Sequence, residues 1–102
     1  MHFVLSYDLS LQGEQRTQVE NQIQTIISPY RHVRCLTTFY IVHIDDRVAW
    51  QNILNLLSEL SRQNQGQLLF VMSPIMQGGR YNGMLQTGGW DAINELTDLD
   101  AQ

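Results

Sequence analysis

The chain has 102 residues, 43% of them hydrophobic, and a formal net charge of −4 with six arginines and no lysine. This composition is typical of one folded domain, residues 1–102, and excludes a disordered chain. No apolar run approaches the ~20 residues of a membrane span, and no basic region precedes the first apolar stretch. We therefore expect a cytoplasmic protein with no membrane association.

The charges are distributed unevenly along the chain. Residues 1–90 contain six acidic residues and all six arginines, whereas the last twelve residues contain four acids and no arginine. The body is therefore neutral and the tail acidic. Proteins that bind nucleic acid nonspecifically usually have a basic excess, so the composition argues against binding by the whole surface. The single cysteine, Cys35, permits no internal disulfide.

The first two elements are predicted to be a strand and a helix. Residues 2–7 alternate in a way that would place successive side chains on opposite faces of a strand. Gly13 marks a break, and apolar residues then recur at helical spacing through residues 14–28. Pro29 ends this helix because proline cannot continue the hydrogen-bond ladder.

A β-rich segment and a second helix are predicted next. Residues 31–44, RHVRCLTTFYIVHI, are rich in β-branched and aromatic residues. They predict either one long bent strand or two strands joined by a kink near residues 36–38. The sequence IDDR then begins a helix over residues 46–63, with Asp45 as the expected N-cap and Asp46 beside the positive end of the helix dipole.

The last third of the chain contains one more strand and a less regular segment. Residues 67–73, QLLFVMS, form a continuous apolar run, which suits a strand covered on both faces. Residues 74–102 are predicted to form a glycine-rich loop, a short helix over about residues 88–97 and an acidic tail. The glycine-rich residues 78–89 lack the GKS/T ending of a phosphate-binding loop.

The order of these elements predicts an α+β fold of the ferredoxin-like β-α-β-β-α-β type, with two helices on one face of an antiparallel sheet. The opposite face of the sheet would then be covered by water, by a partner chain or by the C-terminal segment.

Two short stretches resemble a known family. SYDLS at the end of the first strand and TTFYIV before the second helix are similar to the CRISPR-associated protein two family. The stand-alone members, sometimes called SinR-like, are the more similar because their tail also carries tryptophan near a final helix. The resemblance covers about residues 2–73. It implies a ferredoxin-like fold, a prokaryotic source and a symmetric homodimer.

The resemblance also implies a function. Members of this family have been described as metal-dependent nucleases, or as non-catalytic nucleic-acid-binding partners of an integrase. The aspartate that ends the first strand is the family's metal-linked residue, which is Asp8 here, with Ser10 beside it. The acidic, lysine-free composition of this chain departs from what such binding requires.

Asp8 is the candidate catalytic and metal-binding residue. A Mg²⁺ site is usually built from one or two carboxylates with water and substrate phosphates, so Mg²⁺ or Mn²⁺ would suit a lone aspartate. In a two-fold dimer, the Asp8 carboxylates of two chains could hold one ion. The alternative is that Asp8 and Ser10 accept backbone hydrogen bonds in a turn.

Two arginines are the other candidates for nucleic-acid binding, together with Ser10. Arg31 and Arg34 lie close together in the sequence, and arginine is suited to bidentate contact with phosphate. The alternative is that they are surface arginines that pair with neighbouring acids.

The C-terminal segment is a candidate interface. Tryptophan and methionine are enriched at interfaces, and this chain has more of them than a small sheet must bury. We therefore expect Met84, Leu85 and Trp90 to pack against a second copy or over the open face of the sheet. Core filling within one chain is the alternative.

Two functions remain open from the sequence. The first is a homodimeric protein that binds RNA or DNA, or cuts it as a divalent-metal-dependent endonuclease or endoribonuclease through Asp8. The second is a non-catalytic dimeric interaction module that docks on a protein partner.

Overall fold

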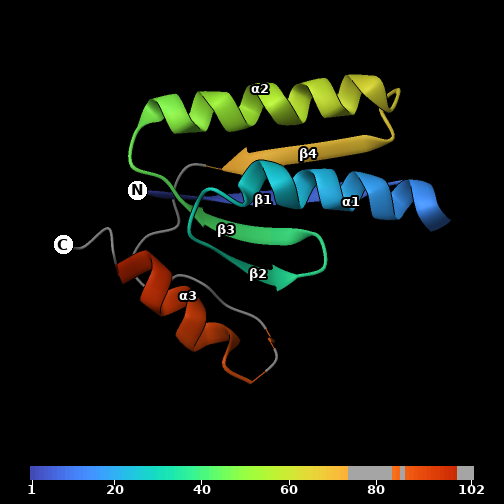
Figure 1. Ribbon diagram of the computed structural model, residues 1–102. Helices are drawn as coiled ribbons and strands as arrows, with labels where there is room; N and C mark the ends of the chain where they lie inside the picture. The colour runs from blue at the N-terminus through green and yellow to red at the C-terminus, as the bar shows by residue number, and fades with distance from the viewer. Residues whose placement is uncertain (74–83, 86, 99–102) are drawn as a thin grey trace.

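The computed structural model describes residues 1–73, 84–85 and 87–98 (Figure 1). The described elements, in chain order, are β1 (His2–Leu9), α1 (Gly13–Ile27), β2 (His32–Leu36), β3 (Phe39–His43), α2 (Arg47–Gln63), β4 (Leu68–Ser73) and α3 (Gly89–Asp98). The predicted acidic tail beyond residue 98 and most of the predicted glycine-rich loop lie outside the described residues.

The four described strands form one antiparallel sheet in the order β2-β3-β1-β4. Strand β1 is central, with Leu5 opposite Tyr40 of β3 on one side and opposite Met72 of β4 on the other. Helices α1 and α2 lie on one face of the sheet and α3 lies on the other (Figure 1). The predicted α+β class is therefore confirmed.

The main hydrophobic core lies between the sheet and the pair α1 and α2. Phe3 and Leu5 of β1 contribute to it, and Ile23 of α1 and Ile53 of α2 are fully buried against the same cluster. These residues recur at strand spacing in β1 and at helical spacing in the helices, which is why the sequence pattern located them.

A second, smaller core lies on the opposite face. Ile93 and Leu96 of α3 are buried against Val4 of β1 and Ile41 of β3. Helix α3 thus covers β2, β3 and the Val4 end of β1 on this face. Helix α3 does not cover the rest of this face, where Leu69 and Val71 of β4 are exposed.

The β-rich segment is a hairpin, which was one of the two predicted arrangements. Strands β2 and β3 are joined by a turn at Thr37 and Thr38, and the register shifts between Arg34 and Leu36. Neither turn residue is a glycine, so the usual tight-turn signal is missing from this hairpin.

Two predictions about local structure are wrong. The N-cap of α2 is Asp46, whose carboxylate accepts a hydrogen bond of 2.9 Å from the Ala49 backbone N–H, so the prediction of Asp45 was one residue early. Strand β4 is not covered on both faces, because Leu69 and Val71 are 61% and 65% exposed. A continuous apolar run does not show which faces are covered.

The first strand is also longer than predicted, since β1 continues to Leu9 and includes Asp8. Within the described residues, no helix combines the length and the apolar character needed to cross a membrane.

Candidate functional site

Asp8 is the residue before the last residue of β1, and its side chain is on the face of the sheet opposite α1 and α2. The neighbouring residues Tyr7 and Leu9 are buried on the helix side, so Asp8 faces the other side and is exposed. In the described part of the chain, the Asp8 carboxylate has no hydrogen bond and no ion pair. The alternative prediction, that Asp8 accepts backbone hydrogen bonds in a turn, is therefore not supported among the described residues.

The immediate surroundings of Asp8 are apolar. Asp8 is directly opposite Leu69 of β4, and Ser6 is opposite Val71. Because side chains alternate along a strand, all four lie on one face of the sheet. We call this surface, formed by Ser6, Asp8, Leu69 and Val71, the open half of the sheet.

Ser10 follows the end of β1 and is exposed. Its backbone N–H donates a hydrogen bond of 2.9 Å to the carbonyl of Gln67, which immediately precedes β4. This contact ties the end of β1 to the start of β4, beside Asp8.

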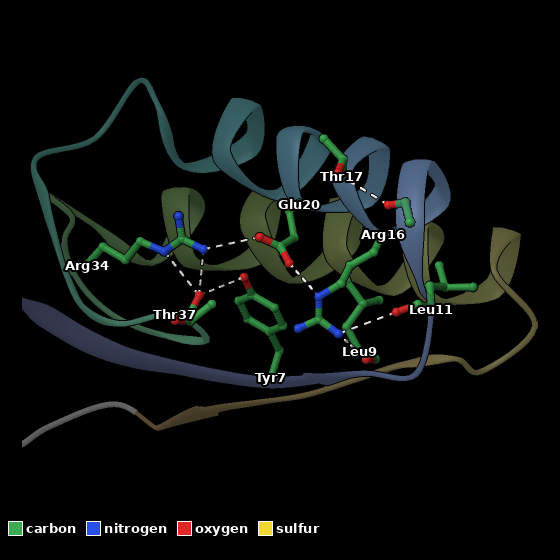
Figure 2. A network of polar contacts seen from close by, with 9 residues as sticks. Tyr7, Leu9, Leu11, Arg16, Thr17, Glu20, Arg34 and Thr37 are labelled. Carbon is green, nitrogen blue, oxygen red and sulfur yellow. Dashed lines mark hydrogen bonds and ion pairs between the residues drawn. The ribbon is translucent and has the colours of Figure 1, made fainter.

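Arg34 has partners of its own on the helix side of the sheet (Figure 2). Its guanidinium Nη2 donates to the Glu20 carboxylate at 3.3 Å, and both Nε and Nη2 donate to the Thr37 carbonyl at 3.0 and 2.7 Å. The guanidinium carbon also lies 5.4 Å from the centre of the Tyr40 ring. Most N–H donors of Arg34 therefore bond within the fold. This agrees with the alternative prediction that Arg34 is a surface arginine paired with a neighbouring acid.

Glu20 is shared between two arginines (Figure 2). Its other oxygen, Oε1, accepts a hydrogen bond of 2.8 Å from Nε of Arg16, and Nη1 of Arg16 donates to the Leu9 carbonyl at 2.7 Å. Neither Arg16 nor Glu20 was predicted from the sequence to be a site residue. Their spacing of four residues on a predicted helix was the signal that could have found them.

Tyr7 joins this network from β1. Its hydroxyl donates a hydrogen bond of 3.1 Å to the Thr37 carbonyl. Burial raises the pKa of the Tyr7 phenol above its ordinary value; the nearby Tyr40 and the Glu20 carboxylate add to the rise, and Arg34 opposes it. The phenol thus stays protonated and remains a donor.

The structure does not bring the predicted nucleic-acid residues together. Arg34 is opposite Tyr40, which belongs to the helix-side core, so Arg34 and Asp8 are on opposite faces of the sheet. Arg31 is exposed, and its carbonyl accepts a hydrogen bond from His43, the residue opposite the start of β1. Arg31 and Asp8 are therefore at opposite ends of the sheet.

The three predicted interface residues differ from one another. Leu85 and Trp90 are partly buried and pack against the second core, which is one of the two predicted positions for them. Met84 is 93% exposed. The sequence pattern did not separate these cases.

Asp8 is compatible with a metal site that has few protein ligands. No three His, Cys, Asp or Glu side chains come together to hold a metal ion among the described residues. Mg²⁺ is commonly bound by one or two carboxylates with water and substrate oxygens, and one exposed carboxylate per chain is compatible with that pattern. A second carboxylate would have to come from another chain.

No family model, no curated protein and no solved structure matches the chain.

Proposed function

We propose that this chain is a homodimeric nucleic-acid-binding protein of the CRISPR-protein-two-like or SinR-like class. In this proposal Asp8 binds Mg²⁺ or Mn²⁺ and supports the hydrolysis of RNA or DNA. The observation that carries the proposal is the Asp8 carboxylate, which is exposed at the end of β1 and has no partner in the described part of the chain.

The arrangement of the elements supports the class. A ferredoxin-like protein would place two helices on one face of an antiparallel sheet, and α1 and α2 lie on one face here. The sheet order β2-β3-β1-β4, with β1 and β3 in the middle, is compatible with two interlocked β-α-β units. The SYDLS stretch, residues 6–10, includes the end of the central strand β1, which supports the proposed class.

The open half of the sheet supports a dimer. Leu69 and Val71 are large apolar side chains that are more than half exposed next to Asp8. Removal of apolar surface from water contributes about 25 cal/mol per Å², so burying this surface favours association. In a two-fold dimer the contacting surfaces are identical, and two Asp8 carboxylates would therefore approach each other near the axis.

The chemistry at such a site is limited by what one carboxylate per chain can do. A divalent cation, when bound, would neutralise charge on a phosphodiester and make a bound water more acidic. Asp8 would hold and orient the ion, and the apolar side chains around it would limit access of bulk water. The neutral body of the chain predicts weak rather than tight binding of the nucleic-acid backbone.

The test is cleavage of labelled single-stranded RNA and DNA with Mg²⁺ or Mn²⁺ and with a chelator. We expect cleavage that requires the metal and is lost in Asp8→Asn, which keeps the shape of the side chain and removes its charge. Asp45→Asn is the matched control, because Asp45 is also exposed but lies before α2. Asp45→Asn should cleave as the wild type does.

Two results would contradict the nuclease. One is an absence of cleavage at every metal concentration, and the other is equal cleavage by Asp8→Asn, which would indicate a contaminating enzyme.

The non-catalytic interaction module is the second candidate. It is favoured by the separation of Asp8, Arg31 and Arg34, which leaves no cluster of predicted phosphate ligands in the described part of the chain. It predicts that the chain self-associates without cutting nucleic acid, and that deletion of residues 84–102 removes binding to a protein partner. Retention of partner binding after that deletion would contradict the module as stated.

A further inference from the structure

A groove of about 290 Å³ lies between α1 and the turn that joins α2 to β4. Seven of its nine lining residues have primary amide side chains, six glutamines and one asparagine, and none of the nine is charged. We call it the amide groove. Its volume is at the small end of ligand pockets, which suits a small ring system rather than a long ligand.

The groove presents mainly polar side chains to a ligand. Leu11 and Val19, the two remaining lining residues, are buried in the main core. Gln15, Gln18 and Gln22 line the groove from α1, where residues three and four apart share one face of the helix. A flat ligand could therefore contact the α1 amides with its edge.

The amides on α1 are available to a ligand. Within the described residues, the side chains of Gln15, Gln18 and Gln22 are exposed and have no hydrogen bond. Asn64 is different, because its amide donates a hydrogen bond of 2.8 Å to the Leu60 carbonyl and so closes the end of α2. The α1 glutamines are thus the residues that could read a ligand.

The two arginines beside the groove are already paired. Arg16, which is next to Gln15, contacts Glu20, and Arg62, which is next to Gln63, contacts Glu59. A phosphate or a carboxylate would find no counterion among the lining residues, and moving an ion out of water without one is costly. The ligand that fits is therefore uncharged and rich in hydrogen-bonding groups.

We propose that the amide groove binds an adenine ring. A primary amide offers one acceptor and a donor side by side, and adenine offers the complementary pair, its N6 amino group and a ring nitrogen. The ring could come from a free nucleoside or from a base of a single-stranded nucleic acid.

The position of the groove connects it to Asp8. Leu11 follows Asp8 by three residues, and the hydrogen bond from Ser10 to the Gln67 carbonyl joins two segments that border the groove. The groove and Asp8 are thus at the same end of the sheet, on its helix side and its open side respectively. This part of the inference rests on the proposed function, since it makes the groove a base-reading site for the strand that Asp8 acts on.

The test is an NMR titration of the full ¹⁵N-labelled chain in the presence of a chelator, so that no metal and no cleavage contribute. Adenosine should shift the side-chain amide signals of Gln18 and Gln22. Oligo(A) that binds more tightly than adenosine would identify the nucleic acid as the source of the ring, and equal affinity would identify the nucleoside.

Two variants on α1 provide the comparison. Gln18→Ala should weaken adenosine binding roughly tenfold, by the loss of one bidentate amide contact. Gln24→Ala is the matched control, because Gln24 is exposed on the same helix but does not line the groove, and its affinity should equal that of the wild type.

The inference fails if adenosine and oligo(A) leave the groove signals unchanged, or if Gln18→Ala and Gln24→Ala bind adenosine equally. These outcomes are independent of the nuclease. A chain that cuts RNA at Asp8 without shifts in the groove retains the proposed function and loses the adenine site. A chain that binds adenosine in the groove but cuts no nucleic acid retains the adenine site and loses the proposed nuclease function.

Discussion

The Thr37 carbonyl is the most heavily used acceptor in the described network. It receives two hydrogen bonds from the Arg34 guanidinium and one from the Tyr7 hydroxyl (Figure 2). Arg34 in turn contacts Glu20 on α1. One turn carbonyl therefore joins the β2–β3 hairpin to the central strand β1 and, through Arg34, to α1.

This network predicts a specific response of Tyr7→Phe. Loss of the hydroxyl removes one hydrogen bond and should lower the free energy of unfolding by about 1 kcal/mol at neutral pH. Because burial raises the pKa of Tyr7, the folded state retains the phenolic proton at a pH where the unfolded state has lost it. The corresponding stability is complete below about pH 10, the ordinary tyrosine pKa, and is lost as the pH rises through the raised pKa of the folded state.

The measurement is the free energy of unfolding of wild type and Tyr7→Phe from pH 7 to alkaline pH. The two curves should converge as the pH rises, since only the wild type has this phenol to ionise. Burial also raises the pKa of Cys35, but that contribution occurs in both proteins and cancels in the difference. Curves that stay parallel would contradict the role given to Tyr7, and Tyr30→Phe controls for the removal of another core phenol.

At the scale of one element, substitutions at Asp45 and Asp46 test which residue is the N-cap of α2. Asp46 accepts the hydrogen bond from the Ala49 backbone N–H, whereas Asp45 makes no such contact. Asp46→Ala should therefore lower the free energy of unfolding by about 1 kcal/mol, the usual effect of losing an N-cap side chain. Asp45→Ala should have a much smaller effect in the same denaturant titration, and the opposite order would show that Asp45 is the cap.

The neighbouring aspartates also show what the sequence could predict. Residue types located the start of α2 to within one residue, because both candidates favour an N-cap and only backbone geometry distinguishes them. The strands and helices were found because apolar residues recur at the period of each element. The length of β1 was underestimated, since Asp8 is an unfavourable strand residue held there by pairing with β4.

The candidate site was less predictable for a related reason. Arg31 and Arg34 are close in the sequence, but Arg31 precedes β2 and only Arg34 lies on the strand. Arg34 faces the helices and finds Glu20, fourteen residues earlier in the chain. The short sequence distance therefore predicted that Arg31 and Arg34 share a site, but the structure does not bring them together.

At the scale of the whole molecule, the helices cover the two faces of the sheet unequally. Helices α1 and α2 cover one face, whereas α3 covers β2, β3 and the Val4 end of β1 on the other (Figure 1). Asp8, Leu69 and Val71 are on the remaining half. The position of α3 thus restricts any broad contact on this face to the half that contains Asp8.

The proposed dimer therefore predicts that a charge on this half blocks association. Val71→Glu should convert a dimer into a monomer in sedimentation equilibrium, because two glutamates would be buried near the two-fold axis without partners. Val48→Glu is the matched control, since Val48 is 66% exposed on α2 and Val71 is 65% exposed on β4. The same residue type at the same exposure would then differ only in the face that it occupies.

The metal dependence of association completes this prediction. If two Asp8 carboxylates meet at the axis, they repel each other without a cation, so Mg²⁺ should strengthen the wild-type dimer and leave Asp8→Asn unaffected. A wild-type chain that is monomeric at all concentrations would remove the dimer. A dimer that Val48→Glu breaks and Val71→Glu spares would move the interface to α2, and Asp8 would then be too far from its symmetry mate to share an ion.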